Sequence, residues 1–225
     1  LKMFEFGKTY LKEKDKYLED EKLCLFITGD KSPKNWNKKT EKCDFYYIKG
    51  IVNSIIEQLN ISNLNSKPTK DKNLVEGETI IHNTLTIATY GIIKSESLII
   101  FGIEQEVYYA EFNWKNIIKS LDNRPILTKK IPKYPEVSRD LSILIDENIT
   151  FKSIYDVAYK ANQNLIKNIS LFDVYLGGNI PKNKKSYGLN FNISDESKTL
   201  SDKEIDGLMN KITNSIIKEF GAELR

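Results

Sequence analysis

The chain has 225 residues, of which 40% are hydrophobic and 29% charged, and this length and composition fit a soluble globular protein of one large domain or two ordinary ones. No apolar run approaches a membrane span and no signal-peptide pattern opens the chain, so we expect a cytoplasmic protein without membrane contact. The net charge of +3, with 13 Lys and Arg against 13 Asp and Glu in residues 133–225, excludes a non-specific nucleic-acid binder, and any nucleic-acid contact should be local.

The chain begins inside a strand pattern, so we expect a fragment of a longer protein. Alternating residues predict strands over Met3–Leu11 and Leu23–Thr28, joined by a charged turn at Lys12–Lys22. A loop over Gly29–Thr40 follows. A helix should then begin after the N-cap Asp44, because apolar residues recur at helical spacing at Ile48, Ile51, Val52, Ile55, Ile56 and Leu59.

The segment Asn60–Asn83 is rich in Asn, Ser, Lys and Gly, which predicts mostly loop with a short strand at most. The patterns after it predict a strand at Leu85–Ile93, a short helix in Ser95–Gly102, a strand at Val107–Phe112 and a helix over Asn113–Leu121. Cys24, Cys43 and His82 lack the neighbours of a metal site, so we expect reduced thiols and no metal or cofactor in this chain.

Residues 122–137 contain three prolines and several lysines, and they interrupt the regular patterns. This composition is typical of a domain boundary. We therefore predict one domain over residues 1–128 and a second over residues 132–225.

The second domain reads as β-α-β-β-α-β. A strand at Ser138–Ile145 precedes a helix capped by Thr150, and two strands follow within Leu171–Asn192. A helix should start at Ser201, where Ser201 and Glu204 form a capping box, and end at Gly221, before a short strand in Ala222–Arg225. This order is the ferredoxin-like arrangement, with both helices on one face of an antiparallel sheet, and it makes the chain an α+β protein.

Strand alternation divides the side chains of this sheet between two faces. The helices should cover Leu141, Ile143, Phe172, Val174, Tyr187, Leu189 and Phe191. The open face should carry Ser142, Asp173, Tyr175 and Ser186. A ring, a carboxylate and hydroxyls on one surface suit the binding of an unstacked base, although an ordinary solvated sheet would show the same pattern. The hairpin residues Lys182, Lys184 and Lys185 are either phosphate contacts or a solvated loop.

Short segments of both halves of the sequence resemble a known family. RDLSILID, LFDVYLGG, KKSYGLNF, TLSDKEID and FGAELR resemble the ferredoxin-fold anticodon-binding domain of bacterial phenylalanyl-tRNA synthetase beta subunits. MFEFGKTYL, CDFYYIKG and VYYAEFNW resemble the class II-like module of the same subunits. The resemblance implies a partial class II synthetase-like sheet module followed by a ferredoxin-like domain.

The family attaches phenylalanine to its tRNA with ATP and magnesium, in a heterotetramer of two alpha and two beta subunits. The resemblance implies that the alpha subunit binds phenylalanine and ATP and that this chain is non-catalytic. A class II site needs arginines in its second and third motifs, but Met3–Leu11 and Val107–Leu121 contain none and Arg124 lies beyond them. The resemblance further implies that the anticodon binds the open face, with a base stacked on Tyr175 and base edges hydrogen-bonded by Ser142, Asp173 and Ser186.

Two other functions fit a ferredoxin-like domain, because this fold hosts many functions. One is a regulatory module that binds a small ligand or dimerises through sheet edges. Such a sensor usually has a glycine turn at a helix start, whereas Gly177 and Gly178 lie in the hairpin. The other is an RNA-recognition motif, whose paired aromatics on adjacent central strands are absent here.

Overall fold

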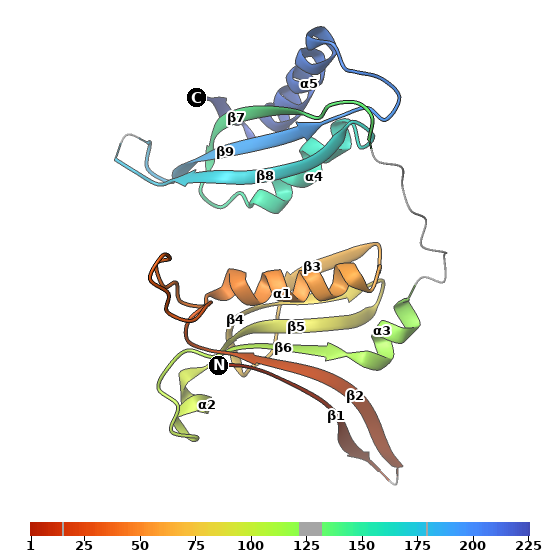
Figure 1. Ribbon diagram of the computed structural model, residues 1–225, viewed down its shortest axis with the longest axis vertical. Coiled ribbons are helices and arrows are strands. Elements are labelled where there is room, and N and C mark those ends of the chain that lie inside the picture. Colours follow the sequence, from red (N-terminus) through yellow and green to blue (C-terminus); the bar gives the residue numbers. More distant parts are fainter. Residues whose placement is uncertain (15, 122–131, 179) are drawn as a thin grey trace. The chain divides into compact units, whose positions relative to one another are not determined.

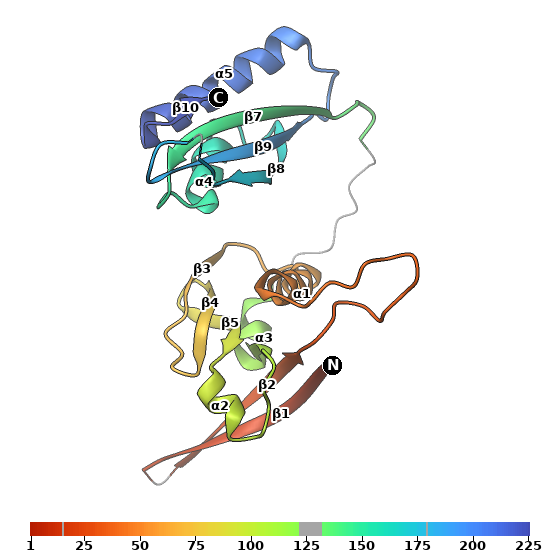
Figure 2. The same ribbon diagram turned by 90° about the vertical axis from the view of Figure 1, so that its left-hand side faces the viewer.

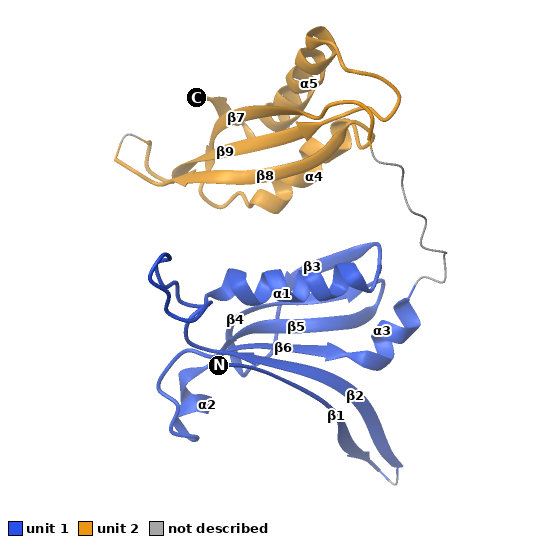
Figure 3. Cartoon of the chain, viewed as in Figure 1, with its two compact units in different colours: residues 1–126 blue, residues 127–225 orange. Residues whose placement is uncertain are grey.

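The structure is a computed structural model that describes residues 1–225 except 15, 122–131 and 179. The chain divides into two compact units, residues 1–126 and 127–225 (Figure 3). Each unit has one antiparallel sheet with helices packed on it, so the prediction of an α+β fold is confirmed. The domain boundary predicted between residues 128 and 132 falls almost wholly outside the described residues.

The N-terminal unit is a six-stranded sheet in the order β1-β2-β6-β5-β4-β3. Its strands are β1 (Lys2–Glu13), β2 (Lys16–Ile27), β3 (Leu64–Pro68), β4 (Leu74–His82), β5 (Leu85–Ile93) and β6 (Tyr108–Asn113), and its helices are α1 (Phe45–Gln58), α2 (Ser95–Ile99) and α3 (Trp114–Ser120). Helix α1 lies along one face of the sheet (Figures 1 and 2) and buries Ile48, Val52 and Ile56 there. As predicted, Asp44 caps α1, with its carboxylate accepting a hydrogen bond from Tyr47 N.

Two predictions for this unit are wrong. The charged segment Lys12–Lys22 is not a turn, because β1 and β2 pair without interruption from Lys2 opposite Ile27 to Glu13 opposite Lys16. At the far end of this hairpin both faces of the two strands are exposed to solvent. Charged residues can therefore continue the strands there, because neither face has to be apolar. The segment Asn60–Asn83 is not mostly loop either, since β3 and β4 occupy much of it and pair with each other.

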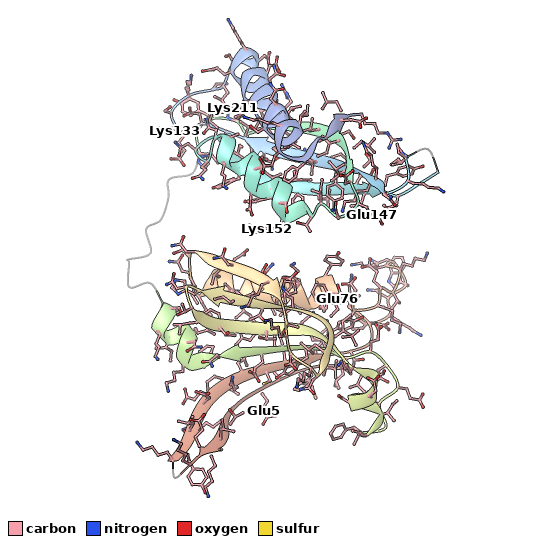
Figure 4. All side chains as sticks on the ribbon, turned by 180° about the vertical axis from the view of Figure 1, so that it is seen from behind. Glu5, Glu76, Lys133, Glu147, Lys152 and Lys211 are labelled. Carbon is pink, nitrogen blue, oxygen red and sulfur yellow. The ribbon has the colours of Figure 1, made fainter. Side chains whose placement is uncertain are left out.

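The C-terminal unit is a four-stranded sheet in the order β10-β7-β9-β8. Its elements are β7 (Val137–Asp146), α4 (Phe151–Ala161), β8 (Ile166–Tyr175), β9 (Lys184–Ile193), α5 (Asp202–Phe220) and β10 (Glu223–Leu224). The predicted β-α-β-β-α-β order is confirmed. Helices α4 and α5 cover the same face of the sheet, behind the strands in Figure 1 and in front of them in Figure 4. No helix formed by the described residues of this unit lies on the opposite face, which we call the helix-free face.

The ends of the two helices follow the predicted local chemistry. The Thr150 hydroxyl accepts a hydrogen bond from Ser153 N at 3.3 Å. At the start of α5 the Glu204 carboxylate accepts from Ser201 N at 2.9 Å and also pairs with Lys198. Gly221 ends α5 with a φ of 63°, a left-handed conformation in which glycine is unstrained.

Acid should remove the stabilising effect of this cap. The ion pair with Lys198, followed by the hydrogen bonds from Ser201, lowers the pKa of Glu204 from 4.5 to about 2. A carboxyl whose folded pKa is depressed stabilises the fold above pH 4.5, and this contribution is lost as the pH falls from 4.5 towards 2. We expect Glu204→Gln to be less stable than the wild type in urea at pH 7 and equally stable near pH 2. A stability difference that stays constant with pH would contradict this assignment.

Candidate nucleic-acid interface

The helix-free face gathers residues from all four strands of the C-terminal sheet. Two neighbouring rows of paired residues form its centre, Ser142, Gly188 and Asp173 in one and Leu144, Ser186 and Tyr175 in the other. Directly paired residues project to the same side of a sheet. Because the intervening residues Ile143 and Tyr187 are buried among the helices, both rows project away from the helices. The structure thus places Ser142, Asp173, Tyr175 and Ser186 on one face.

These four residues differ in accessibility. Ser142 and Asp173 are exposed, and Tyr175 is 38% exposed. Ser186 is only 5% exposed although it lies in the same row as Tyr175. Three of the four side chains are therefore accessible at the surface, and Ser186 is not.

The prediction that the helices cover Phe172 and Val174 is wrong, since these residues are 61% and 49% exposed. The pairing of β8 with β9 passes from Leu171 to Asp173 and leaves Phe172 as the extra residue of a β-bulge. A Cβ atom at Gly188 would lie 2.8 Å from the Phe172 Cζ, so the ring lies over this glycine on the helix-free face. Val174 keeps its place on the helix side, near the end of the strand.

Arg225 belongs to the same surface, and the sequence patterns did not identify it. Its backbone N–H donates to the Ser142 carbonyl at 3.1 Å, which continues the pairing of β10 with β7. Its guanidinium carbon lies 5.3 Å from the centroid of the Tyr175 ring, in a cation–π contact. The signal that could have indicated Arg225 was the short C-terminal strand, whose pairing brings residue 225 beside Ser142.

The three hairpin lysines do not share one surface. Lys182 is exposed in the connection between β8 and β9, and Lys184 pairs with Glu223, which raises the pKa of Lys184. Lys185 Nζ lies 4.8 Å from the centroid of the Tyr187 ring, which faces the helices. Of the two lysines within β9, Lys184 therefore projects to the helix-free face and Lys185 to the helix side.

In the N-terminal unit, the sheet face opposite α1 carries polar side chains that bond to one another. Lys22 Nζ donates to Glu111 at 2.8 Å, and the Tyr109 hydroxyl donates to the same carboxylate at 3.1 Å. The Cys24 sulfur lies 3.5 Å from that hydroxyl, and burial raises the pKa of the Cys24 thiol. Because these four side chains contact one another, they do not form a cluster of unpaired ionisable groups on this face.

Among the described residues there is neither a metal-binding cluster nor a membrane-spanning helix. Within residues 1–14, 16–121, 132–178 and 180–225, no group of three or more His, Cys, Asp and Glu side chains is placed to hold a metal ion. In the same part of the chain, no helix combines the length and the apolar character needed to cross a membrane.

Comparison with known proteins adds to this geometry. Residues 132–225 match the family described as ferredoxin-fold anticodon binding domain, and residues 1–114 match the phenylalanyl tRNA synthetase beta chain CLM domain. Phenylalanine--tRNA ligase beta subunits of Bacteroides thetaiotaomicron and Porphyromonas gingivalis are 36% and 31% identical to the chain. Both alignments cover 100% of this chain and 29% of the relative, so the chain spans less than a third of their length.

One solved structure has a weaker likeness to the chain. The pyrrolysyl-tRNA synthetase of Desulfitobacterium hafniense is 12% identical and has a TM-score of 0.39, over 52% of this chain and 40% of that one. A likeness this low supports no argument about fold or function.

Proposed function

The chain belongs to the family of phenylalanine--tRNA ligase beta subunits, and we propose that it is the C-terminal part of such a subunit and binds the anticodon of phenylalanine tRNA. The observation that carries this proposal is the exposed group Ser142, Asp173 and Tyr175 on the helix-free face. This group lies within the unit that matches an anticodon-binding family. The comparisons favour this function over a module that binds a small regulatory ligand.

Each exposed side chain has a role that fits its chemistry. The Tyr175 ring offers a surface on which an unstacked base can stack. The Asp173 carboxylate only accepts hydrogen bonds when ionised, so it suits the amino or imino groups of a base edge. The Ser142 hydroxyl both donates and accepts. Ser186 is buried, so it would contribute only if its neighbours move. Among the hairpin lysines, Lys184 projects to the helix-free face, where it pairs with Glu223, and it is the one that we propose contacts a phosphate.

The chemistry of aminoacylation is proposed to lie outside this chain. The assembled enzyme, a cytoplasmic heterotetramer of two alpha and two beta subunits, would bind phenylalanine, ATP and magnesium through its alpha subunits. Strands β1 and β6 and helix α3 contain no arginine to bind ATP phosphates. The polar side chains around Glu111, which bond to one another, support the same assignment.

Replacement of Tyr175 tests the proposal. Tyr175→Ala should weaken the binding of phenylalanine tRNA about 5- to 150-fold, because one base–aromatic stack is worth about 1–3 kcal/mol. The melting temperature should change little because the ring is 38% exposed. Ser186→Ala should have a smaller effect on binding. Filter binding at one fixed salt concentration measures the affinities of both variants for this tRNA. Unaltered affinity of a folded Tyr175→Ala variant would show that the anticodon binds elsewhere.

Salt should weaken the binding of the isolated 225-residue chain only gradually. Residues 133–225 are balanced in charge, so few phosphates can be neutralised. The slope of log K against log salt is about −0.7 for each phosphate contact to a single strand. We expect a slope shallower than about −4, which corresponds to fewer than about six contacts. A steeper slope in a salt titration would indicate a basic surface elsewhere on the chain.

A further inference from the structure

We propose that Phe172 is a second stacking platform, so that the helix-free face holds two unstacked bases of the same RNA, one on Phe172 and one on Tyr175. This inference rests on the proposed function and deepens it, because it adds a binding residue and states how many bases the surface holds. It follows from the bulge in β8, from the exposure of the Phe172 ring and from the spacing of the two rings.

The bulge puts two consecutive residues on the same side of the sheet. Leu171 pairs with Leu189 on the helix side and Asp173 pairs with Gly188 on the helix-free face, with Phe172 unpaired between them. The place of the ring is fixed by Gly188, at which a Cβ would lie 2.8 Å and 2.9 Å from two carbons of the Phe172 ring. A side chain at position 188 would displace the ring, so the glycine makes room for it on this face.

Folding leaves most of the Phe172 side chain exposed. The ring is 61% exposed, whereas Phe191 on the neighbouring strand is fully buried. Among the described residues, no other ring and no cation stacks on Phe172. Strand β8 is also an edge of the sheet, where an exposed aromatic ring invites unwanted association. A base stacked on the ring would bury this surface when RNA binds.

The spacing of the two rings favours two bases over one. Three residues along a strand span about 10 Å, somewhat less across a bulge. Stacked bases follow each other about 3.4 Å apart along a strand of duplex. Two bases on Phe172 and Tyr175 would therefore be separated from each other, and Asp173 lies between them within reach of either base edge.

The two platforms should differ in selectivity. Tyr175 has the Arg225 guanidinium 5.3 Å from its ring centroid, and Arg225 can stack on a base or bind a phosphate. The Phe172 side chain has no polar atom, and its ring lies over Gly188. The base on Phe172 should therefore be bound by stacking alone. Because every base can stack, this platform should not select one base over another.

The experiment uses the assembled synthetase with a full-length beta subunit and phenylalanine tRNAs that each lack one base of the anticodon loop. Phe172→Ala and Phe172→Leu should each weaken binding of the intact tRNA about 5- to 150-fold, and Phe172→Tyr should retain it. Removal of one particular base should weaken wild-type binding but not that of Phe172→Ala. Binding by Tyr175→Ala should be insensitive to the removal of a different base. Val174→Ala, on the same strand but projecting to the helix side, is the matched control and should bind normally.

The outcomes separate the inference from the proposed function. If Tyr175→Ala weakens binding while both Phe172→Ala and Phe172→Leu bind normally, the second platform is overturned and the proposed function stands. Insensitivity of the Phe172 and Tyr175 variants to the same missing base would also overturn it, because the two rings would then hold one base. If neither ring affects binding in variants that melt normally, the proposed function fails together with the inference.

Discussion

Phe191→Ala should destabilise the C-terminal unit by about 3–5 kcal/mol, because it removes a large side chain from a fully packed core and leaves a cavity. Phe191 is 0% exposed and lies on β9 among the residues that contact α4 and α5. Phe172→Ala, in contrast, should cost less than about 1 kcal/mol, because its ring is 61% exposed and its removal opens no cavity. Urea unfolding of the two variants, compared with the wild type, measures both free energies.

The comparison is well matched because the residues are of one type and lie on paired strands. Leu171→Ala is a useful third variant, since Leu171 pairs with Leu189 and contacts the core although it is only partly buried. We expect its cost to lie between those of the two phenylalanines. If Phe172→Ala were as costly as Phe191→Ala, Phe172 would be buried in solution and β8 would be paired without a bulge.

The elements that could be predicted from the sequence are those with one buried face and a clear end. Helix α5 is an example, because its apolar stripe recurs at helical spacing and Ser201, Glu204 and Gly221 mark its two ends. The β1–β2 hairpin could not be predicted over its charged length, because both of its faces are exposed and no alternation marks it. In Asn60–Asn83 the sequence allowed one short strand and the structure has two, β3 and β4. Strand β3 has no buried residue to mark it, because pairing with β4 rather than apolar burial holds it in place.

The candidate site divides along similar lines. Asp173 and Tyr175 could be placed together because alternation holds beyond the bulge, and Ser142 follows from the regular strand β7. The side of Phe172 could not be predicted, because alternation assumes that every residue is paired. Gly188 was the available signal, since a glycine inside a strand often marks a bulge or a close approach. The burial of Ser186 depends on surrounding side chains, which strand alternation does not describe.

The second large effect is expected at Glu78, which connects α1 to two strands of the N-terminal sheet. Its carboxylate accepts a hydrogen bond from the Tyr90 hydroxyl at 2.6 Å and another from Lys49 Nζ at 2.7 Å. Tyr90 is 0% exposed, and burial followed by the neighbouring carboxylate raises the pKa of its hydroxyl. The hydroxyl therefore stays protonated and needs an acceptor inside the protein.

Glu78→Ala should destabilise the N-terminal unit by about 1–3 kcal/mol, the cost of leaving a buried donor without a partner. The ion pair with Lys49 should add little, because the two side chains are 34% and 24% exposed and solvent screens their attraction. Glu78→Gln keeps an acceptor for Tyr90 and should cost less. Glu76→Ala, an exposed residue on the same strand (Figure 4), is the control and should be close to neutral.

A double-mutant cycle isolates the buried hydrogen bond. In a Tyr90→Phe background the buried donor is absent, so Glu78→Ala should lose only the screened ion pair with Lys49 and cost clearly less than in the wild type. Because Tyr90 is on β5 and Lys49 is on α1, the two contributions of Glu78 can be removed separately. Urea unfolding of the four proteins gives the interaction free energy. An equal cost of Glu78→Ala in both backgrounds would show that the Tyr90 hydroxyl finds another partner and that Glu78 stabilises the unit through Lys49.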